Sequence, residues 1–337
     1  MKQLGIVVAT LFFVGSCTYE RPTKSGSNGK TCEIMVVAEK ADFQSAMGDS
    51  LKAFFMQSQM WLNQFEPLFT LVNITPTAFN QSEMFKHMRN MIILQRSSEN
   101  TGDSTHFTIR RDVWSSNQVV AEFTITDKNK FFPLFKEKQK LIMGAFYTAE
   151  RIRMKRVFKS TENVKISELL MKKFGFRLTC PDGFRITVNK PEVVALNLEA
   201  KDYGQNILIS TYPYTAESFK QSDILKHRNT IAQKYVQGSI DSSYMTTETL
   251  LPPESREVNF AGMYAIETRG LWKLVGDFMG GPFQNYVFLN KETGNIVMID
   301  VFLYSPRKPK RDLMMQLEGI AYSIDFAKRE ITKATKP

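Results

Sequence analysis

The sequence predicts two layered domains of mixed α and β structure, an α/β first half followed by an α+β second half. The chain has 337 residues, of which 43% are apolar and 23% are charged. These proportions are typical of a folded globular chain, and the length allows one large domain or two ordinary ones. The first half alternates strand and helix patterns, whereas the second half has a run of predicted hairpins followed by a final helix. These orders favour a layered α/β sheet and then an antiparallel sheet with flanking helices.

The first 16 residues have the pattern of a secretory signal peptide. Lys2 precedes an apolar run from Leu4 to Val14, whose 11 residues are too few to cross a bilayer as a helix. Gly15 and Ser16 then lead into Cys17, and this string resembles a bacterial lipobox. We therefore expect residues 1–16 to be removed and Cys17 to be lipidated. An ordinary cleaved signal followed by an unmodified cysteine is the alternative.

Residues 17–31 are rich in Ser, Thr, Gly, Lys and Pro, a composition that predicts a flexible tether. By resemblance to other lipoproteins, Thr18 in place of Asp favours the outer membrane, with the domains facing the periplasm. The expected partners are the membrane, through the lipid anchor, and either an envelope protein or anionic lipid. Nucleic acid is not expected as a partner in this compartment.

The first folded domain is expected to span residues 32–175. Its predicted strands have buried or alternating apolar patterns and lie at residues 32–39, 68–75, 90–95, 106–111 and 121–126. Its predicted helices lie at residues 42–55, 133–158 and 167–174. Pro133 suits the first turn of the long helix, because proline has no amide hydrogen to leave unbonded there.

The second folded domain is expected at residues 176–326, with a tail at 327–337. Its predicted strands lie at residues 176–180, 185–189, 193–198, 207–212, 245–250, 256–259, 263–272, 284–289 and 296–304. Its predicted helices lie at residues 223–236 and 310–322. The order of elements is similar to that of antiparallel sandwiches of the PsbP or Mog1 kind, a similarity of architecture that carries no function.

The common catalytic, metal and cofactor motifs are missing from the sequence. Gly29-Lys30-Thr31 lacks the first glycine of a phosphate-binding loop, because that position holds Lys24. The patterns G-x-S-x-G, H-E-x-x-H and C-x-x-C do not occur. The three histidines, which lie far apart in the sequence, are His87, His106 and His227. The sequence therefore predicts no metal, no cofactor and no assigned catalytic residue.

Two cysteines remain besides Cys17. Cys32 and Cys180 each fall in a predicted strand, so we expect both to be small buried side chains. Because an envelope compartment permits disulfides, a bond between them stays open.

Basic residues concentrate in two segments. Residues 128–173 hold 13 basic and 4 acidic side chains, which indicates either cations that complement the end of the long helix or a face for anionic headgroups. Four further cations lie before and within the first turn of the last predicted helix, namely Arg307, Lys308, Lys310 and Arg311. Cations are unfavourable at a helix N-terminus, so these residues predict an anion-binding site, with a solvated loop as the alternative.

Two strings combine aromatic, charged and glycine residues. The first, at residues 110–115, contains Arg111, Asp112 and Trp114. The second, at residues 270–283, contains Trp272, Asp277, Gly280, Gly281 and Phe283. Glycine lets a backbone approach closely and aromatic rings offer apolar surface, so we interpret these residues as a ligand-binding surface. The alternative is a buried strand that ends in a glycine-rich turn.

These two strings, with the lipobox and the segment Tyr304–Arg311, resemble an uncharacterised lipoprotein family of Bacteroidota, domain of unknown function 4837. The resemblance extends over about Lys30 to Phe326. It implies an envelope lipoprotein without an established activity, and it transfers no functional residue to this chain.

The sequence therefore favours an outer-membrane lipoprotein that binds or scaffolds and is not an enzyme. Its expected ligand or partner surface is that of Trp114, Trp272 and Asp277. The alternative is a hydrolase of envelope glycan or lipid that uses Asp112 or Asp277 as acid or base.

Overall fold

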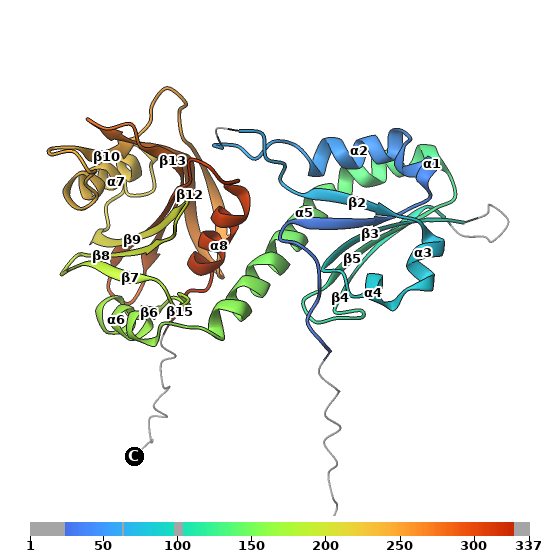
Figure 1. Ribbon diagram of the computed structural model, residues 1–337, viewed down its shortest axis with the longest axis horizontal. Coiled ribbons are helices and arrows are strands. Elements are labelled where there is room, and N and C mark those ends of the chain that lie inside the picture. The colour runs from blue at the N-terminus through green and yellow to red at the C-terminus, as the bar shows by residue number, and fades with distance from the viewer. Residues whose placement is uncertain (1–23, 63, 98–103, 327–337) are drawn as a thin grey trace, which may run out of the picture.

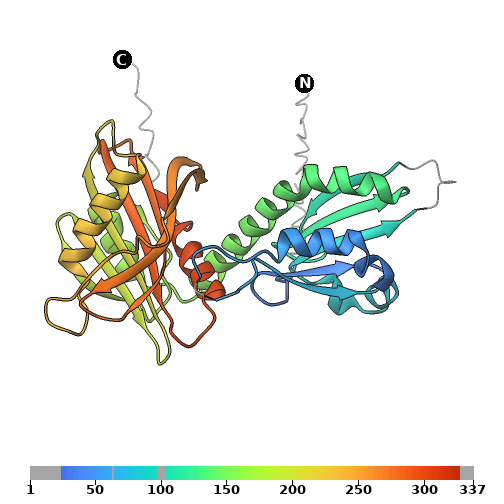
Figure 2. The same ribbon diagram turned by 90° about the horizontal axis from the view of Figure 1, so that it is seen from above.

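The computed structural model describes residues 24–62, 64–97 and 104–326. Two layered domains lie beside each other, and one long helix, α5 (Lys128–Lys159), runs from the first domain to the second (Figures 1 and 2). With 32 residues, α5 is about 48 Å long. This architecture confirms the predicted fold class.

The first domain is a three-layer α/β sandwich. Its sheet has the order β2-β1-β3-β5-β4, in which β4 is antiparallel to β5 and the other pairs are parallel. The strands are β1 (Glu33–Val37), β2 (Thr70–Ile74), β3 (Asn90–Arg96), β4 (His106–Arg111) and β5 (Val119–Ile125). The helices besides α5 are α1 (Lys40–Phe43), α2 (Ala46–Phe55), α3 (Pro76–Gln81) and α4 (Glu83–Lys86). Helices α2 and α5 cover one face of the sheet, and α3 and α4 cover the other.

The second domain is built on one curled antiparallel sheet. Its order is β10-β12-β13-β14-β9-β8-β7, and β11 also pairs with β12. The strands are β7 (Arg185–Lys190), β8 (Val193–Glu199), β9 (Gly204–Pro213), β10 (Tyr244–Thr247), β11 (Glu254–Phe260), β12 (Met263–Val275), β13 (Gly280–Asn290) and β14 (Asn295–Tyr304).

Helices cover both faces of this sheet. One face packs against α6 (Val164–Phe174), α8 (Arg311–Ala321) and the small sheet of β6 (Phe176–Arg177) and β15 (Asp325–Phe326). The other face packs against α7 (Gln221–Tyr235). Strand residues alternate between these two cores. For example, Val194 and Leu196 enter the first core, whereas Val193 and Ala195 enter the second.

The structure corrects three expectations about elements. Helix α5 begins five residues before Pro133, because the Asp127 side chain caps it by accepting a hydrogen bond from the amide of Asn129 at 2.8 Å. Helix α6, expected to close the first domain, packs in the core of the second through Ile166 and Leu170. Strand β6 is only two residues long, shorter than the predicted segment.

The second half of the expected tether is attached to the first domain. Gly26 forms a β-bridge with Ser116, and Asn28 forms one with Met88. The segment 24–31 is therefore part of the fold, whereas residues 17–23 of the expected tether lie outside the described residues. Cys17 and the leader 1–16 lie outside the described residues, as does the tail 327–337. No helix in the described part of the chain is long and apolar enough to span a bilayer.

Candidate functional site

The two halves of the predicted ligand-binding surface lie in different domains. Trp114 packs on Phe79 of α3, with the ring centroids 5.8 Å apart, in the core between the first sheet and the helices α3 and α4. Trp272 lies in the core beneath α7 in the second domain, and its indole Nε1 donates to the carbonyl of Leu303 at 3.1 Å. Both tryptophans are packing residues, so the structure does not support a joint surface formed by them.

The charged residues of the two strings shape turns. Asp112 has a positive φ of 52°, and its Oδ1 accepts from the amide of Asn117 at 2.5 Å. Asp277 lies in the turn between β12 and β13, where Oδ1 accepts from the amide of Phe278 at 2.6 Å. Arg111 is exposed at the end of the edge strand β4. The two carboxylates lie in different domains, and each accepts from a backbone amide of its own turn.

The glycines of the second string permit close strand packing. A Cβ on Gly281 would lie 2.1 Å from the carbonyl oxygen of Leu303, and a Cβ on Gly280 would lie 2.8 Å from that of Trp272. Phe283 is buried, and its ring lies 3.8 Å from the guanidinium of Arg228. These three residues therefore pack closely against the protein itself, and Phe283 also lines the small cavity described below.

The predicted anion site at the start of α8 is occupied by a carboxylate of the protein. The Glu66 side chain, from the first domain, accepts from the amide of Lys310 at 2.8 Å and from that of Arg311 at 2.7 Å. The Arg311 guanidinium also donates to the carbonyl of Pro67 and the hydroxyl of Thr70, each at 3.1 Å. Of the other two predicted anion ligands, Lys308 pairs with Asp202, and Arg307 is exposed. The site thus joins the two domains.

A second connection between the domains is a chain of alternating charges. Arg151 of α5 donates to Glu318 of α8 at 2.7 Å, and Glu318 also contacts Arg269 of β12 at 3.3 Å. Arg269 then pairs with Glu267 at 2.8 Å, and Glu267 accepts from Arg256 at 2.5 Å. Burial alone would raise the pKa of Glu267, but the two guanidiniums lower it to about 2. The Glu267 carboxylate therefore stays ionised although it is buried.

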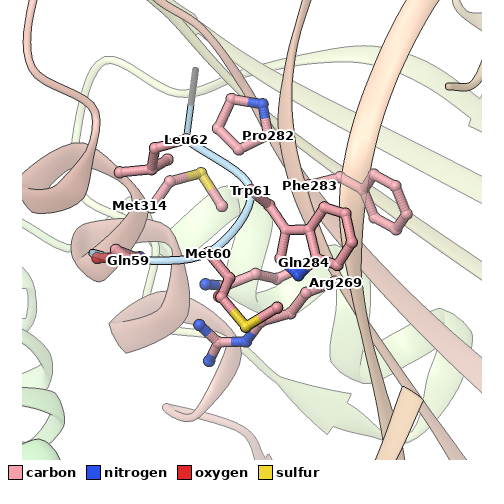
Figure 3. Close-up of a pocket in the computed structure, with 9 residues that line it drawn as sticks. All are labelled: Gln59, Met60, Trp61, Leu62, Arg269, Pro282, Phe283, Gln284 and Met314. Carbon is pink, nitrogen blue, oxygen red and sulfur yellow. The ribbon is translucent and has the colours of Figure 1, made fainter. Parts of the chain in front are cut away.

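A small cavity lies where the two domains meet and is lined by residues of both (Figure 3). The loop between α2 and β2 reaches over the second domain, and its residues Met60, Trp61 and Leu62 line the cavity together with residues of β12, β13 and α8. Its volume of about 10 Å³ leaves room for about one water molecule. An open surface depression of about 400 Å³ also lies along β11 and β12. Neither of these two cavities is lined by Asp112 or Asp277.

The structure also shows polar pairs that the sequence patterns did not indicate. Ser210 Oγ lies 3.1 Å from Nε2 of His227, and the His227 ring stacks on Tyr212 with centroids 3.8 Å apart. Burial lowers the pKa of His227 to about 4, against a smaller opposing effect of Asp223. Ser210 is fully buried beneath α7, so a substrate cannot reach this pair.

A buried ion pair lies further along the same face of the sheet. Arg228 Nε donates to Asp300 Oδ1 at 2.9 Å, and both side chains are fully buried. Asn285 also donates to Asp300, at 3.2 Å. These residues are distant in sequence, and only the pairing of β13 with β14 and the position of α7 bring them together.

Cys32 and Cys180 are free thiols, and both are buried. They lie in separate cores, Cys32 with the first sheet and Cys180 with the second. Burial raises the pKa of each thiol well above its usual range. Low solvent access and a high pKa both oppose thiol reactivity, so the cysteines are packing residues.

The protein thus has an α/β domain and an α+β domain, and buried polar contacts connect the two. Residues 163–323, which form the second domain, match the family described as a domain of unknown function (DUF4837). Residues 27–159 match a separate family, also described as a domain of unknown function (DUF8532). The DUF4837 match thus covers less of the chain than the expected Lys30 to Phe326.

Known structures similar to this chain include the Ran-binding protein Mog1p of Saccharomyces cerevisiae, at 10% identity and a TM-score of 0.30. That match covers 45% of this chain and 90% of the other. LpqN of Mycobacterium tuberculosis, described as involved in cell envelope biogenesis, is 12% identical with a TM-score of 0.28, over 45% of this chain and 83% of its own. At these TM-scores neither likeness bears on function. Among curated proteins no match was found.

Proposed function

We propose that this protein is a lipid-anchored component of the bacterial outer membrane that binds an envelope partner and has no catalytic activity. The anchor rests on the leader and on Cys17 in the sequence. The binding role rests on one feature of the second domain, the exposed tip of the hairpin between β12 and β13.

Phe278 is the residue that carries the binding role, because its side chain is fully exposed at this tip. Val275 beside it and Ile240 on the neighbouring loop are also exposed. The two loops touch, since Asp277 Oδ2 accepts from Ser239 Oγ at 3.1 Å. Exposed apolar side chains gathered on adjacent loops are a common feature of protein-binding sites.

The tip is held in one conformation by its own hydrogen bonds. Gly276 supplies a positive φ of 81°, and the Asp277 carboxylate fixes the Phe278 amide. The loop is therefore pre-organised, which reduces the entropy lost on binding. Asp277 serves this conformation, and this role favours binding over the acid or base role that a hydrolase would need.

A photo-reactive phenylalanine analogue at position 278 tests the binding role in intact cells. We expect one discrete covalent adduct with an envelope protein, and we expect Ile240→Ser to lower its yield without changing the melting temperature. The matched control places the analogue at position 250, where Leu250 is 85% exposed on a different loop. Absence of an adduct at position 278, or the same adduct from both positions, would contradict the proposal.

The variant Cys17→Ser tests the anchor. We expect the acyl mass and palmitate labelling to disappear and the protein to leave the outer-membrane fraction. Unchanged labelling in this variant would show that the acyl group is attached elsewhere and would contradict an anchor at Cys17.

A further inference from the structure

The first described residue of the chain lies beside the C-terminal end of α5. Lys24 Nζ donates to the carbonyls of Asp112 and Val113, the latter at 2.7 Å. One residue later, the carbonyl of Ser25 accepts from the amide of Ser116 at 2.8 Å. The Ser116 hydroxyl in turn accepts from Arg156 of α5 at 2.9 Å. The loop 112–117 thus connects the start of the described chain to the end of the long helix.

This end of α5 presents an exposed mixture of cationic and aliphatic side chains. Lys155, Arg156 and Lys159 are exposed there, and Ile152, one turn earlier, is 46% exposed. We call these four residues the α5 end face. They share one side of the helix because they are three or four residues apart.

The other two cations at this end of α5 serve the fold and are not part of the face. Arg151 of α5 pairs with Glu318 of α8 and so connects the two domains. Arg153 is buried and donates to the carbonyls of Asn117 and Arg89.

Acidic groups near the face leave it cationic. Glu162 pairs with Lys159, and Asp112 lies in the loop that holds Lys24. Lys155 and Arg156 have no acidic partner within ion-pair distance in the described part of the structure.

We infer that the α5 end face rests on an anionic bilayer surface. The inference rests on the proposed anchor, because residues 17–23 span at most about 25 Å when fully extended. A lipid on Cys17 would therefore keep Lys24 and its neighbours close to the headgroups. Figure 1 shows that the described chain starts and ends on the side of the molecule where the C-terminal end of α5 also lies.

Cations near an anionic leaflet strengthen binding by about fivefold each, and exposed aliphatic side chains between them enter the headgroup region. The face thus has the chemistry of a peripheral membrane surface.

The test measures vesicle binding by the unlipidated chain 17–337 with Cys17→Ser, which contains every described residue. The vesicles are phosphatidylcholine alone or phosphatidylcholine with 30% phosphatidylglycerol, and binding is read by flotation. We expect binding to the anionic vesicles only, with loss in 1 M salt because screening then acts within about 3 Å.

The variant Lys155→Glu/Arg156→Glu/Lys159→Glu should weaken this binding by at least about tenfold. The matched control, Lys130→Glu/Lys136→Glu/Lys140→Glu, makes the same charge change at exposed positions nearer the start of the same helix. This control should retain most of the binding. Circular dichroism checks that both variants keep the fold.

Absence of binding to anionic vesicles, or equal losses in the two triple variants, would overturn the inference. Acylation of Cys17 is measured separately by mass spectrometry of the full chain. An acylated chain without anionic binding would leave the anchor intact and reject the surface. An unacylated Cys17 with binding lost only in the first variant would reject the anchor and support the surface.

Discussion

His227 is the residue whose surroundings have the clearest consequence for solution behaviour. It extends from α7 to the sheet, where its ring stacks on Tyr212 and contacts Ser210, and burial lowers its pKa to about 4. In the unfolded chain an ordinary histidine titrates near 6.5. Between these two values the unfolded chain binds more protons than the folded one. The contribution of His227 to the free energy of unfolding should therefore be fully present above about pH 6.5 and fall as the pH drops towards 4.

The measurement is urea unfolding at several pH values between 7 and 4, on the wild type and on His227→Phe. We expect the phenylalanine variant to lose part of the pH dependence in this window. Ser210→Ala keeps the imidazole in place, so this control should retain most of the slope. A His227→Phe variant with the wild-type slope would show that other groups cause the dependence.

The predicted anion site shows how far a residue pattern can be interpreted. Lys310 and Arg311 at the start of α8 predicted a bound anion, and in the structure their backbone amides bond a carboxylate of the chain itself. The sequence could not identify it as Glu66, because 244 residues separate Glu66 from Lys310 and no local pattern joins them. In the same way, the chemistry of Trp114 and Trp272 suggested a binding surface, but both side chains pack in cores because their faces of the sheets are covered by helices.

At the scale of elements, segments with strong apolar periodicity predicted helices and strands correctly, whereas short segments or segments with weak periodicity did not. The strands β3, β4 and β8 match the predicted segments closely. Helices α3 and α4 were not predicted, because six and four residues are too few to show a helical period. Helix α6 was predicted as an element, but its domain depends on packing that its own sequence does not encode.

The crossing of α5 and α8 depends on Gly319. A Cβ there would lie 2.6 Å from the Cβ of Met154, closer than side chains pack. We expect Gly319→Ala to force the helices apart and to lower the free energy of unfolding by about 1–3 kcal/mol. Urea unfolding measures this change.

Gly144→Ala is the matched control for that substitution. Gly144 lies in α5, and a Cβ there would meet nothing within 4 Å. Alanine is the better helix former, so this variant should gain about 0.5–1 kcal/mol. If both variants were stabilised, the close approach of α5 and α8 would not be a constraint.

At the scale of the whole molecule, the two domains are expected to unfold together because buried polar contacts join them. Glu66 holds the start of α8, and Glu318 holds Arg151 and Arg269. Such contacts are costly to break on one side alone, since the remaining charge stays buried without a partner. Two separately matched family regions, at residues 27–159 and 163–323, thus form one connected structure.

The variant Glu66→Ala should uncouple the domains. It leaves the amides of Lys310 and Arg311 without their acceptor, which we expect to cost about 1–3 kcal/mol. Single-tryptophan proteins report each domain, because Trp114 lies in the first core and Trp272 in the second. In these proteins, with the other tryptophans changed to phenylalanine, the two urea transitions should coincide when Glu66 is present and separate in Glu66→Ala.

The matched control is Glu257→Ala, at an exposed position on β11, which should leave the two transitions coincident. Coincident transitions in Glu66→Ala would mean that the Arg151, Glu318 and Arg269 contacts alone suffice to couple the domains.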